Sequence, residues 1–173
     1  MAKMTAATLL VAAAMLWSAG AAFAGSAFGV GGGWTGFAPG ERIAHFSFSA
    51  HEASRGDYGQ VHWSLQDPDL QLDVTVDVDC VSIMPSLLGL NAWMDGVVTS
   101  VSPQPNFAGV LVGDRLAFQA REGGSPSVTG MTDEFDAFAE SDAEEIGSPD
   151  CKVRPPAPLS PNVTQGNVVI KGT

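Results

Sequence analysis

The chain has 173 residues, and its 19 acidic side chains outnumber its 8 basic ones to give a formal net charge of −11. This balance excludes a nucleic-acid-binding protein, because phosphates are held by Lys and Arg, and it argues against adhesion to anionic lipid. It favours solubility outside the cell and cationic partners.

The first 24 residues have the three parts of a secretory signal peptide. Lys3 supplies the positive charge, Ala6–Trp17 is almost wholly apolar, and Ala22-Phe23-Ala24 has the small-x-small pattern that precedes a cleavage site. The alternative is a membrane anchor, but the apolar run is short for a span and no basic cluster follows it. We therefore expect a secreted or extracytoplasmic protein, in the periplasm or at the cell surface, with one mature domain (residues 25–173) and no membrane span after cleavage.

Apolar and polar residues alternate with a period of two along most of the mature chain, which predicts β-strands. The strands expected are Arg42–His51, Gln60–Gln66, Leu70–Cys80, Ala92–Val101, Val110–Val112, Leu116–Ala120 and Asn167–Lys171. The first two form an antiparallel hairpin, and alternation places both Leu70 and Cys80 on the core face of the third. Gly96 is a candidate bulge. Residues 110–112 and 116–120 are either two short strands or one strand bent at Gly113-Asp114.

Three segments lack this pattern. Gly31–Gly33 make a poor strand and predict an edge segment or a close approach of another backbone. Asp133–Glu145 is a loop, a short edge strand led by Phe135, or a helical turn. The proline-rich stretch 147–161 predicts an extended connector before the last strand. We expect an all-β fold, either an antiparallel sandwich or a flattened barrel of about eight strands, monomeric by default.

Cys80 and Cys151 are the only cysteines. Export would place them in an oxidising compartment, where a lone pair usually forms a disulfide, and we hypothesise that these two are bonded. Closing a loop of about seventy residues stabilises a fold by about 4 kcal/mol. The alternative is two buried free thiols.

Several short segments, in order and spacing, carry a resemblance. They are Gly31–Trp34, Ala44–His51, Val78–Val81, Asn91-Ala92, Gly96–Val98, Asp133–Phe135, Asp150-Cys151 and Val163–Ile170. In these the chain resembles a family of small exported bacterial proteins of unassigned function, common in high-GC genomes. It departs from that family at Ala120–Gly123, where Asp-Asn-Gly-Glu is usual, and in a longer turn at Met84–Leu90. The resemblance implies an all-β exported domain with a cysteine bridge, and no activity.

The three histidines are His45, His51 and His62, all on the polar face of the predicted hairpin. If Ser49 opposes His62, then His51 lies diagonal to His62 at about 7–8 Å between Cα atoms. Two imidazoles at that spacing are candidate ligands for zinc or copper. The alternative is three exposed strand histidines, because a closed metal site needs more ligands than two.

Two other groups are candidate binding residues. The acidic stretch that contains Asp133, Glu134 and Asp136 is a candidate calcium site, with a solvated acidic loop as the alternative. Trp34 and Tyr58 lie beside glycines and predict an exposed sugar-stacking platform, although aromatic residues more often fill cores. Trp63 falls on the apolar face of its strand and is expected in the core.

The sequence contains no recognisable catalytic motif. It has no nucleophile elbow, no CxxC pair and no phosphate-binding glycine loop, and Arg55 stands where a zinc-protease motif starting at His51-Glu52 needs its second histidine. No catalytic residue or cofactor is assigned, with calcium and zinc as the candidate ions. We expect a non-catalytic exported binding or surface-associated domain whose partner is a cell-envelope glycan or protein. The alternative is a hydrolase or metal-dependent enzyme with an unrecognised site.

Overall fold

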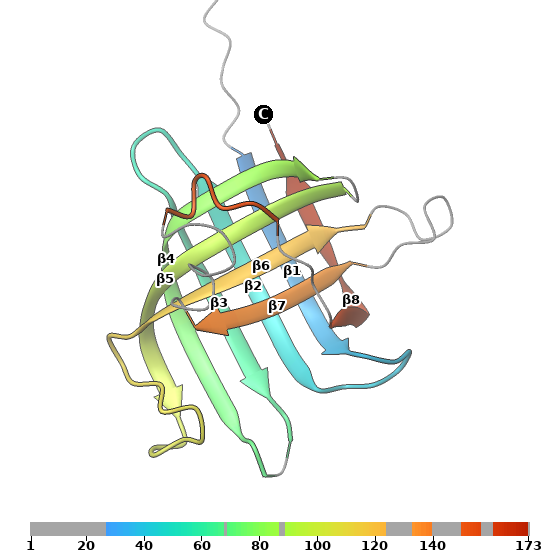
Figure 1. Cartoon of the computed structure of the whole chain (residues 1–173), viewed down its shortest axis with the longest axis vertical. Helices are drawn as coiled ribbons and strands as arrows, with labels where there is room; N and C mark the ends of the chain where they lie inside the picture. The colour runs from blue at the N-terminus through green and yellow to red at the C-terminus, as the bar shows by residue number, and fades with distance from the viewer. Residues whose placement is uncertain are drawn as a thin grey trace, which may run out of the picture.

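The chain folds into a closed barrel of eight antiparallel strands that neighbour one another in sequence order (Figure 1). The computed structural model describes residues 27–67, 69–86, 89–123, 133–139, 150–156 and 161–172, so the predicted signal peptide lies outside it. The strands are β1 (Ala27–Gly36), β2 (Ala44–Glu52), β3 (Tyr58–Leu65), β4 (Leu72–Ser86), β5 (Gly89–Ser102), β6 (Arg115–Glu122), β7 (Glu134–Ala139) and β8 (Asn162–Lys171). The expected all-β fold is confirmed, as a barrel rather than a sandwich. Among the described residues no helix is long and apolar enough to cross a membrane.

The interior of the barrel is filled by apolar side chains, which point inward at every second residue of the strands. In β2 the alternation is as predicted, with Phe46 and Phe48 buried and the serines between them exposed. The ring of Phe135 from β7 stacks on Phe46 at 4.3 Å between centroids and lies within 6 Å of the rings of Phe48 and Phe118. Trp63 packs against this core from β3, as its strand phase predicted.

The glycine run lies in the middle of β1, which lies between β2 and β8 and is therefore not an edge. A Cβ atom at Gly33 would lie 2.0 Å from the carbonyl oxygen of Gln165 on β8, closer than any real contact. Its partner Gly166 is just as crowded, because a Cβ atom there would lie 2.1 Å from the carbonyl oxygen of Gly32. The second of the two expectations, a close backbone approach, is confirmed.

The prediction that Cys80 faces the core is wrong, because β4 contains a bulge. Val78 pairs with Gly96 and Cys80 with Asp95, so one residue of β4 has no partner on β5 and the strand phase reverses there. Val81 then enters the core, while Cys80 turns outward. The bulge lies opposite the predicted position at Gly96, on the neighbouring strand.

Three element boundaries also differ from the prediction. Leu70 precedes β4 and is 42% exposed, so it is not a core residue. Residues 110–112 are not a strand, and Leu111 and Val112 point into solvent because this segment belongs to the long β5–β6 loop. Most of Met84–Leu90 belongs to β4 and β5 rather than to a loop, and Leu87 and Leu88 lie outside the described residues.

The barrel closes between β7 and β8 with the help of side chains. Of the three alternatives for the acidic stretch, its described part forms a strand, β7, and residues 140–145 lie outside the described ranges. Within the described ranges, Glu134 and Asn162 are the only ladder partners across the β7–β8 seam, and beside them the Val163 amide donates to the Asp133 carbonyl oxygen. Carboxylates satisfy further amides of β8: Asp133 accepts from Val168 at 2.7 Å, and Glu122 accepts from Ile170 at 2.9 Å. These acids replace ladder hydrogen bonds that β7 does not supply.

Candidate functional site

The predicted histidine pair is not formed, because the hairpin register differs by two residues from the one assumed. His62 opposes Ser47 rather than Ser49, so His51 opposes Tyr58. His51 and His62 are therefore four residues apart along the strands and lack the assumed diagonal geometry. His45 is the histidine near His62, with 6.4 Å between ring centroids. Within the described ranges no three His, Cys, Asp or Glu side chains gather in a geometry that could hold a metal ion.

The structure instead places rings and polar groups in one row across the outer face of β1 to β4. Trp34, His45, Ser64 and Asp73 are successive cross-strand neighbours in this row. The Trp34 and His45 rings meet edge to face at 5.2 Å, and Nε2 of His62, from the adjoining row, lies 3.2 Å from Oδ1 of Asp73. Trp34 is half-buried rather than exposed, because the Arg42 guanidinium lies 5.4 Å from its ring centroid.

A polar hollow lies at the end of this row, where β3 ends, β4 begins and β5 ends. Its volume is about 300 Å³, and its polar lining consists of Ser64, Gln66, Gln71, Asp73 and Ser102. The Gln66 amide donates to the Ser64 hydroxyl at 2.6 Å, which holds two of these groups in place. Most of the polar groups in this lining are hydroxyls and amides, which both donate and accept hydrogen bonds, and one is a carboxylate. Such a lining suits an uncharged ligand rich in hydroxyl groups.

A second row of rings crosses the outer face near the other end of the same strands. Phe28, His51 and Tyr58 stack in sequence, with centroids 5.9 Å and 4.7 Å apart, and the Lys171 ammonium lies 5.8 Å from the Phe28 centroid. Tyr58 is exposed, as predicted. Because these rings stack on one another, their faces are mostly used within the protein, and Tyr58 ends the row.

Each of the three predicted calcium ligands has its own environment. Asp133 accepts hydrogen bonds from the amides of Gly123 and Val168, which ties it to barrel closure. Glu134 pairs with Arg121, and burial raises its pKa above the ordinary value. Burial also raises the pKa of Asp136 to about 6, and among the described residues the adjacent Ala137 amide donates to it. Carboxylates that are buried, paired with an arginine or bound to amides are poor ligands for a calcium site.

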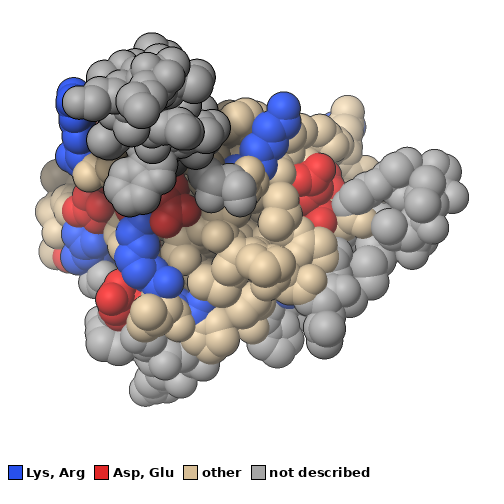
Figure 2. All heavy atoms as spheres, turned by 90° about the horizontal axis from the view of Figure 1, so that it is seen from above, with Lys and Arg blue, Asp and Glu red and all other residues tan. Residues whose placement is uncertain are grey.

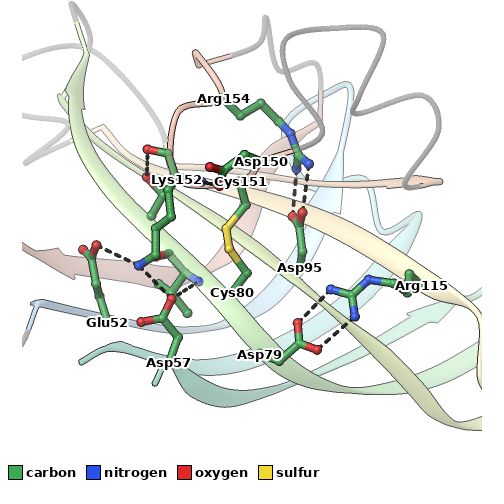
Figure 3. Close-up of a disulfide and its surroundings, with 12 residues drawn as sticks. Glu52, Asp57, Asp79, Cys80, Asp95, Arg115, Asp150, Cys151, Lys152 and Arg154 are labelled. Atoms are coloured by element: carbon green, nitrogen blue, oxygen red, sulfur yellow. Dashed lines mark hydrogen bonds and ion pairs between the residues drawn. A yellow bond between two sulfur atoms is a disulfide. The ribbon is translucent and has the colours of Figure 1, made fainter. Parts of the chain in front are cut away.

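The outer face of β5 and of the end of β4 is covered, unlike that of β1 to β3 and the start of β4. Residues 150–156, here called the strap, cross β4 and β5, and the guanidinium of Arg154 makes two hydrogen bonds of 2.8 Å to the Asp95 carboxylate (Figure 3). Arg154 is fully buried and stacks over Trp93 at 4.8 Å, while the Trp93 indole donates to the Pro155 carbonyl oxygen. The strap thus seals a second, smaller apolar cluster outside the barrel.

The other end of the strap is fixed by the disulfide and by Lys152. Cys80 and Cys151 are bonded, which confirms the predicted pair. Lys152 lies 2.9 Å from Glu52 and 2.7 Å from Asp57 (Figure 3). Burial raises the pKa of Asp57, but hydrogen bonds from Lys152 and two backbone amides outweigh it, so the pKa lies below the ordinary value. Basic and acidic side chains are accordingly interspersed around this end of the barrel (Figure 2).

Sequence reasoning did not find the polar lining of the hollow or the Asp95–Arg154 pair. The strand segment from Asn91 to Gly96 held one signal, because Trp93 occupies the phase opposite to Ala92 and Met94. A strand with bulky apolar residues in both phases is buried on both faces, which requires a covering segment. The hollow left no such signal, because Gln66, Gln71 and Ser102 are ordinary residues for strand ends.

No protein-family model, curated protein or solved structure matches this chain. Function is therefore inferred from the geometry and chemistry of the surfaces described above.

Proposed function

We propose that the protein is an exported, non-catalytic binding domain whose ligand is an uncharged glycan held in the polar hollow. The hollow carries the proposal, because its hydroxyl and amide lining matches the hydrogen-bonding groups of a sugar. Asp73 contacts His62, and its cross-strand neighbour Ser64 lies opposite His45, so two imidazole rings border the polar lining. That combination of polar groups and rings is typical of small-ligand sites.

Export rests on the predicted signal peptide, and the Cys80–Cys151 bond is compatible with an extracytoplasmic location. The resemblance to small exported proteins of unassigned function is part of the same proposal. Among the described residues, Asp73 is the only titratable one that lines the hollow. A single carboxylate favours binding over acid–base catalysis, which commonly needs both an acid and a base.

The test measures binding of neutral polysaccharides, such as glucans and mannans, by affinity electrophoresis and calorimetry. Gln71→Trp should abolish binding by filling the hollow, since Gln71 is exposed and its replacement removes nothing from the core. Asp73→Asn should weaken binding about tenfold through loss of a charge-assisted hydrogen bond. Asp77→Asn is the matched control, because Asp77 is exposed on the same face of β4 but outside the hollow. Equal losses for Asp73→Asn and Asp77→Asn, or binding to charged polymers alone, would rule out the hollow.

The contact between His62 and Asp73 favours hydrolysis as a second candidate function. An aspartate that orients a histidine is a frequent part of a general base, and this pair borders the hollow. An activity screen on glycoside, ester and peptide substrates distinguishes the two functions. Turnover that survives repurification and disappears in His62→Ala would replace the binding proposal by an enzymatic one.

A further inference from the structure

Large exposed apolar side chains gather at one end of the barrel. Of the seven such residues described, five lie in the three hairpin loops 37–43, 66–71 and 103–114, here called the loop end. They are Phe37, Leu70, Phe107, Leu111 and Val112. In Figure 1 all three loops lie at the end of the barrel opposite the C-terminus, and each loop carries at least one of the five. Phe37 and Val112 are 66% and 65% exposed. Exposing large apolar side chains to water is unfavourable in free energy.

Hydrogen bonds within the loops hold these side chains outward. The Glu41 carboxylate accepts from the amides of Phe37 and Ala38 at 2.8 Å and 3.0 Å, which closes the first loop. In the third loop, the Asp114 carboxylate accepts from the Leu111 amide at 2.8 Å, and Asn106 both accepts from the Val110 amide and donates to its carbonyl oxygen. Several backbone groups of the tips are thus satisfied internally. This is what a segment requires before it can enter an apolar medium at low cost.

The charges of the loop end restrict what it can contact. Its charged residues are four acids and one base: Glu41, Asp67, Asp69, Asp114 and Arg42. Arg42 is already engaged, because its guanidinium donates to Gln165 and lies over Trp34. An anionic lipid surface would therefore be repelled, and so would a second copy of the same end.

The distribution of the apolar residues over separate loops favours a fluid partner. A rigid protein pocket accepts one contiguous patch, whereas a lipid interface admits separate side chains to a depth of about 5–10 Å. We propose that the loop end docks on a zwitterionic lipid surface, with the apolar tips inserted and the carboxylates at the level of the headgroups. This inference does not require the glycan proposal, because none of the five apolar side chains lines the hollow, although the same loops contribute Gln66, Gln71 and Pro103 to it.

The experiment measures cosedimentation with vesicles of pure phosphatidylcholine and with vesicles that contain 30 mol% phosphatidylglycerol. The protein used is the chain without residues 1–24, because an apolar leader would itself bind lipid. All described elements of the barrel lie within residues 27–172. We expect binding to phosphatidylcholine that persists in high salt and weakens when phosphatidylglycerol is added. Phe37→Asp and Phe107→Asp should each reduce the partition coefficient by about tenfold.

Val153→Asp is the matched control, because Val153 is equally exposed, at 66%, but lies in the strap. Near-UV circular dichroism confirms that each variant is folded, which is expected because the changed side chains lie outside the core. The proposal is overturned if phosphatidylcholine vesicles bind no protein, or if Val153→Asp reduces binding as much as Phe107→Asp does. It is also overturned if ultracentrifugation shows a dimer that Phe107→Asp dissociates, since the loop end would then be an interface between copies.

Discussion

Removal of the Arg154 guanidinium tests whether the strap is an integral part of the fold. Arg154→Met keeps most of the side-chain bulk over Trp93 but deprives the Asp95 carboxylate of two hydrogen bonds of 2.8 Å. The side chains of Arg154 and Asp95 are 0% and 3% exposed. Breaking a buried ion pair from one side costs about 3–5 kcal/mol, because a charge is left in a poorly solvated site. That is a large part of the about 5–15 kcal/mol that stabilises a typical domain.

The surface pair Arg115–Asp79 provides the matched control. Its two hydrogen bonds, 2.9 Å and 2.7 Å, have the same bidentate geometry, but the side chains are 35% and 52% exposed. Arg115→Met should therefore cost at most about 1 kcal/mol. The double variant Asp95→Leu/Arg154→Met removes both buried charges and should be more stable than Arg154→Met alone.

Urea unfolding at pH 7 under non-reducing conditions measures these differences, with the disulfide intact in every variant. Two results would refute the reasoning. One is a cost for Arg154→Met no larger than that for Arg115→Met, which would mean that the strap detaches without disturbing the barrel. The other is a double variant as unstable as the single one, which would mean that packing rather than charge burial determines the cost.

Three further predictions concern stability. Cys80→Ser should lower the free energy of unfolding by about 4 kcal/mol, because the bond closes a loop of 71 residues, and intact mass before and after reduction verifies the bond. Gly33→Ala should cost more than about 2 kcal/mol of stability, because its Cβ atom would collide with the carbonyl oxygen of Gln165. Gly32→Ala is the control and should be tolerated, because the nearest contact of its Cβ atom is 3.4 Å. Thermal unfolding compares the two variants. For Asp136, the folded pKa of about 6 lies above the unfolded value of 3.8, so the folded state binds the proton more tightly. Its contribution is fully present below pH 3.8 and is lost as the pH rises through 6, by about 3 kcal/mol in total. Asp136→Asn should gain stability relative to the parent at pH 7.5 but not at pH 4; a parallel dependence of both proteins on pH would contradict this.

The parts of the fold that depend on local alternation could be predicted from the sequence. Buried Phe46 and Phe48 alternate with exposed serines, and this pattern alone identifies a strand with one wet face. The pairing of β2 with β3 was also predictable, because a short turn-forming segment joins two such strands. The disulfide followed from having only two cysteines and a predicted export signal.

The register of that hairpin could not be predicted, and the assumed diagonal placement of His51 and His62 depended on it. A slip of one residue would expose the core face, but a slip of two residues leaves every side chain on its own face. Alternation therefore could not distinguish a pairing of His62 with Ser49 from the observed pairing with Ser47. The number of residues in the connecting turn decides between them, and sequence gives element ends only to within a few residues.

The strap could not be predicted for a different reason, since its contacts join residues from 59 to 100 positions apart. The sequence shows a proline-rich connector but not the surface on which it lies. Arg154, the fully buried residue that fixes it, looks in the sequence like any solvated arginine among prolines. The one indication was the segment around Trp93, where apolar side chains on both faces of the strand required another segment to cover the outer face.

The bulge in β4 connects these observations, because one extra residue decides which half of the barrel is covered. Before the bulge, Asp73 and Asp77 point outward and remain exposed, which keeps the hollow and its ring row open. After it, Cys80 and Ser82 point outward instead, and they bind the strap through the disulfide and through a hydrogen bond to the Lys152 carbonyl oxygen. Had the strand phase continued unbroken, Cys80 would face the core, where Cys151 of the strap could not reach it. The extra residue in β4 therefore lies between the part of the outer face that the strap covers and the part that stays exposed. The proposed ligand site lies on the exposed part.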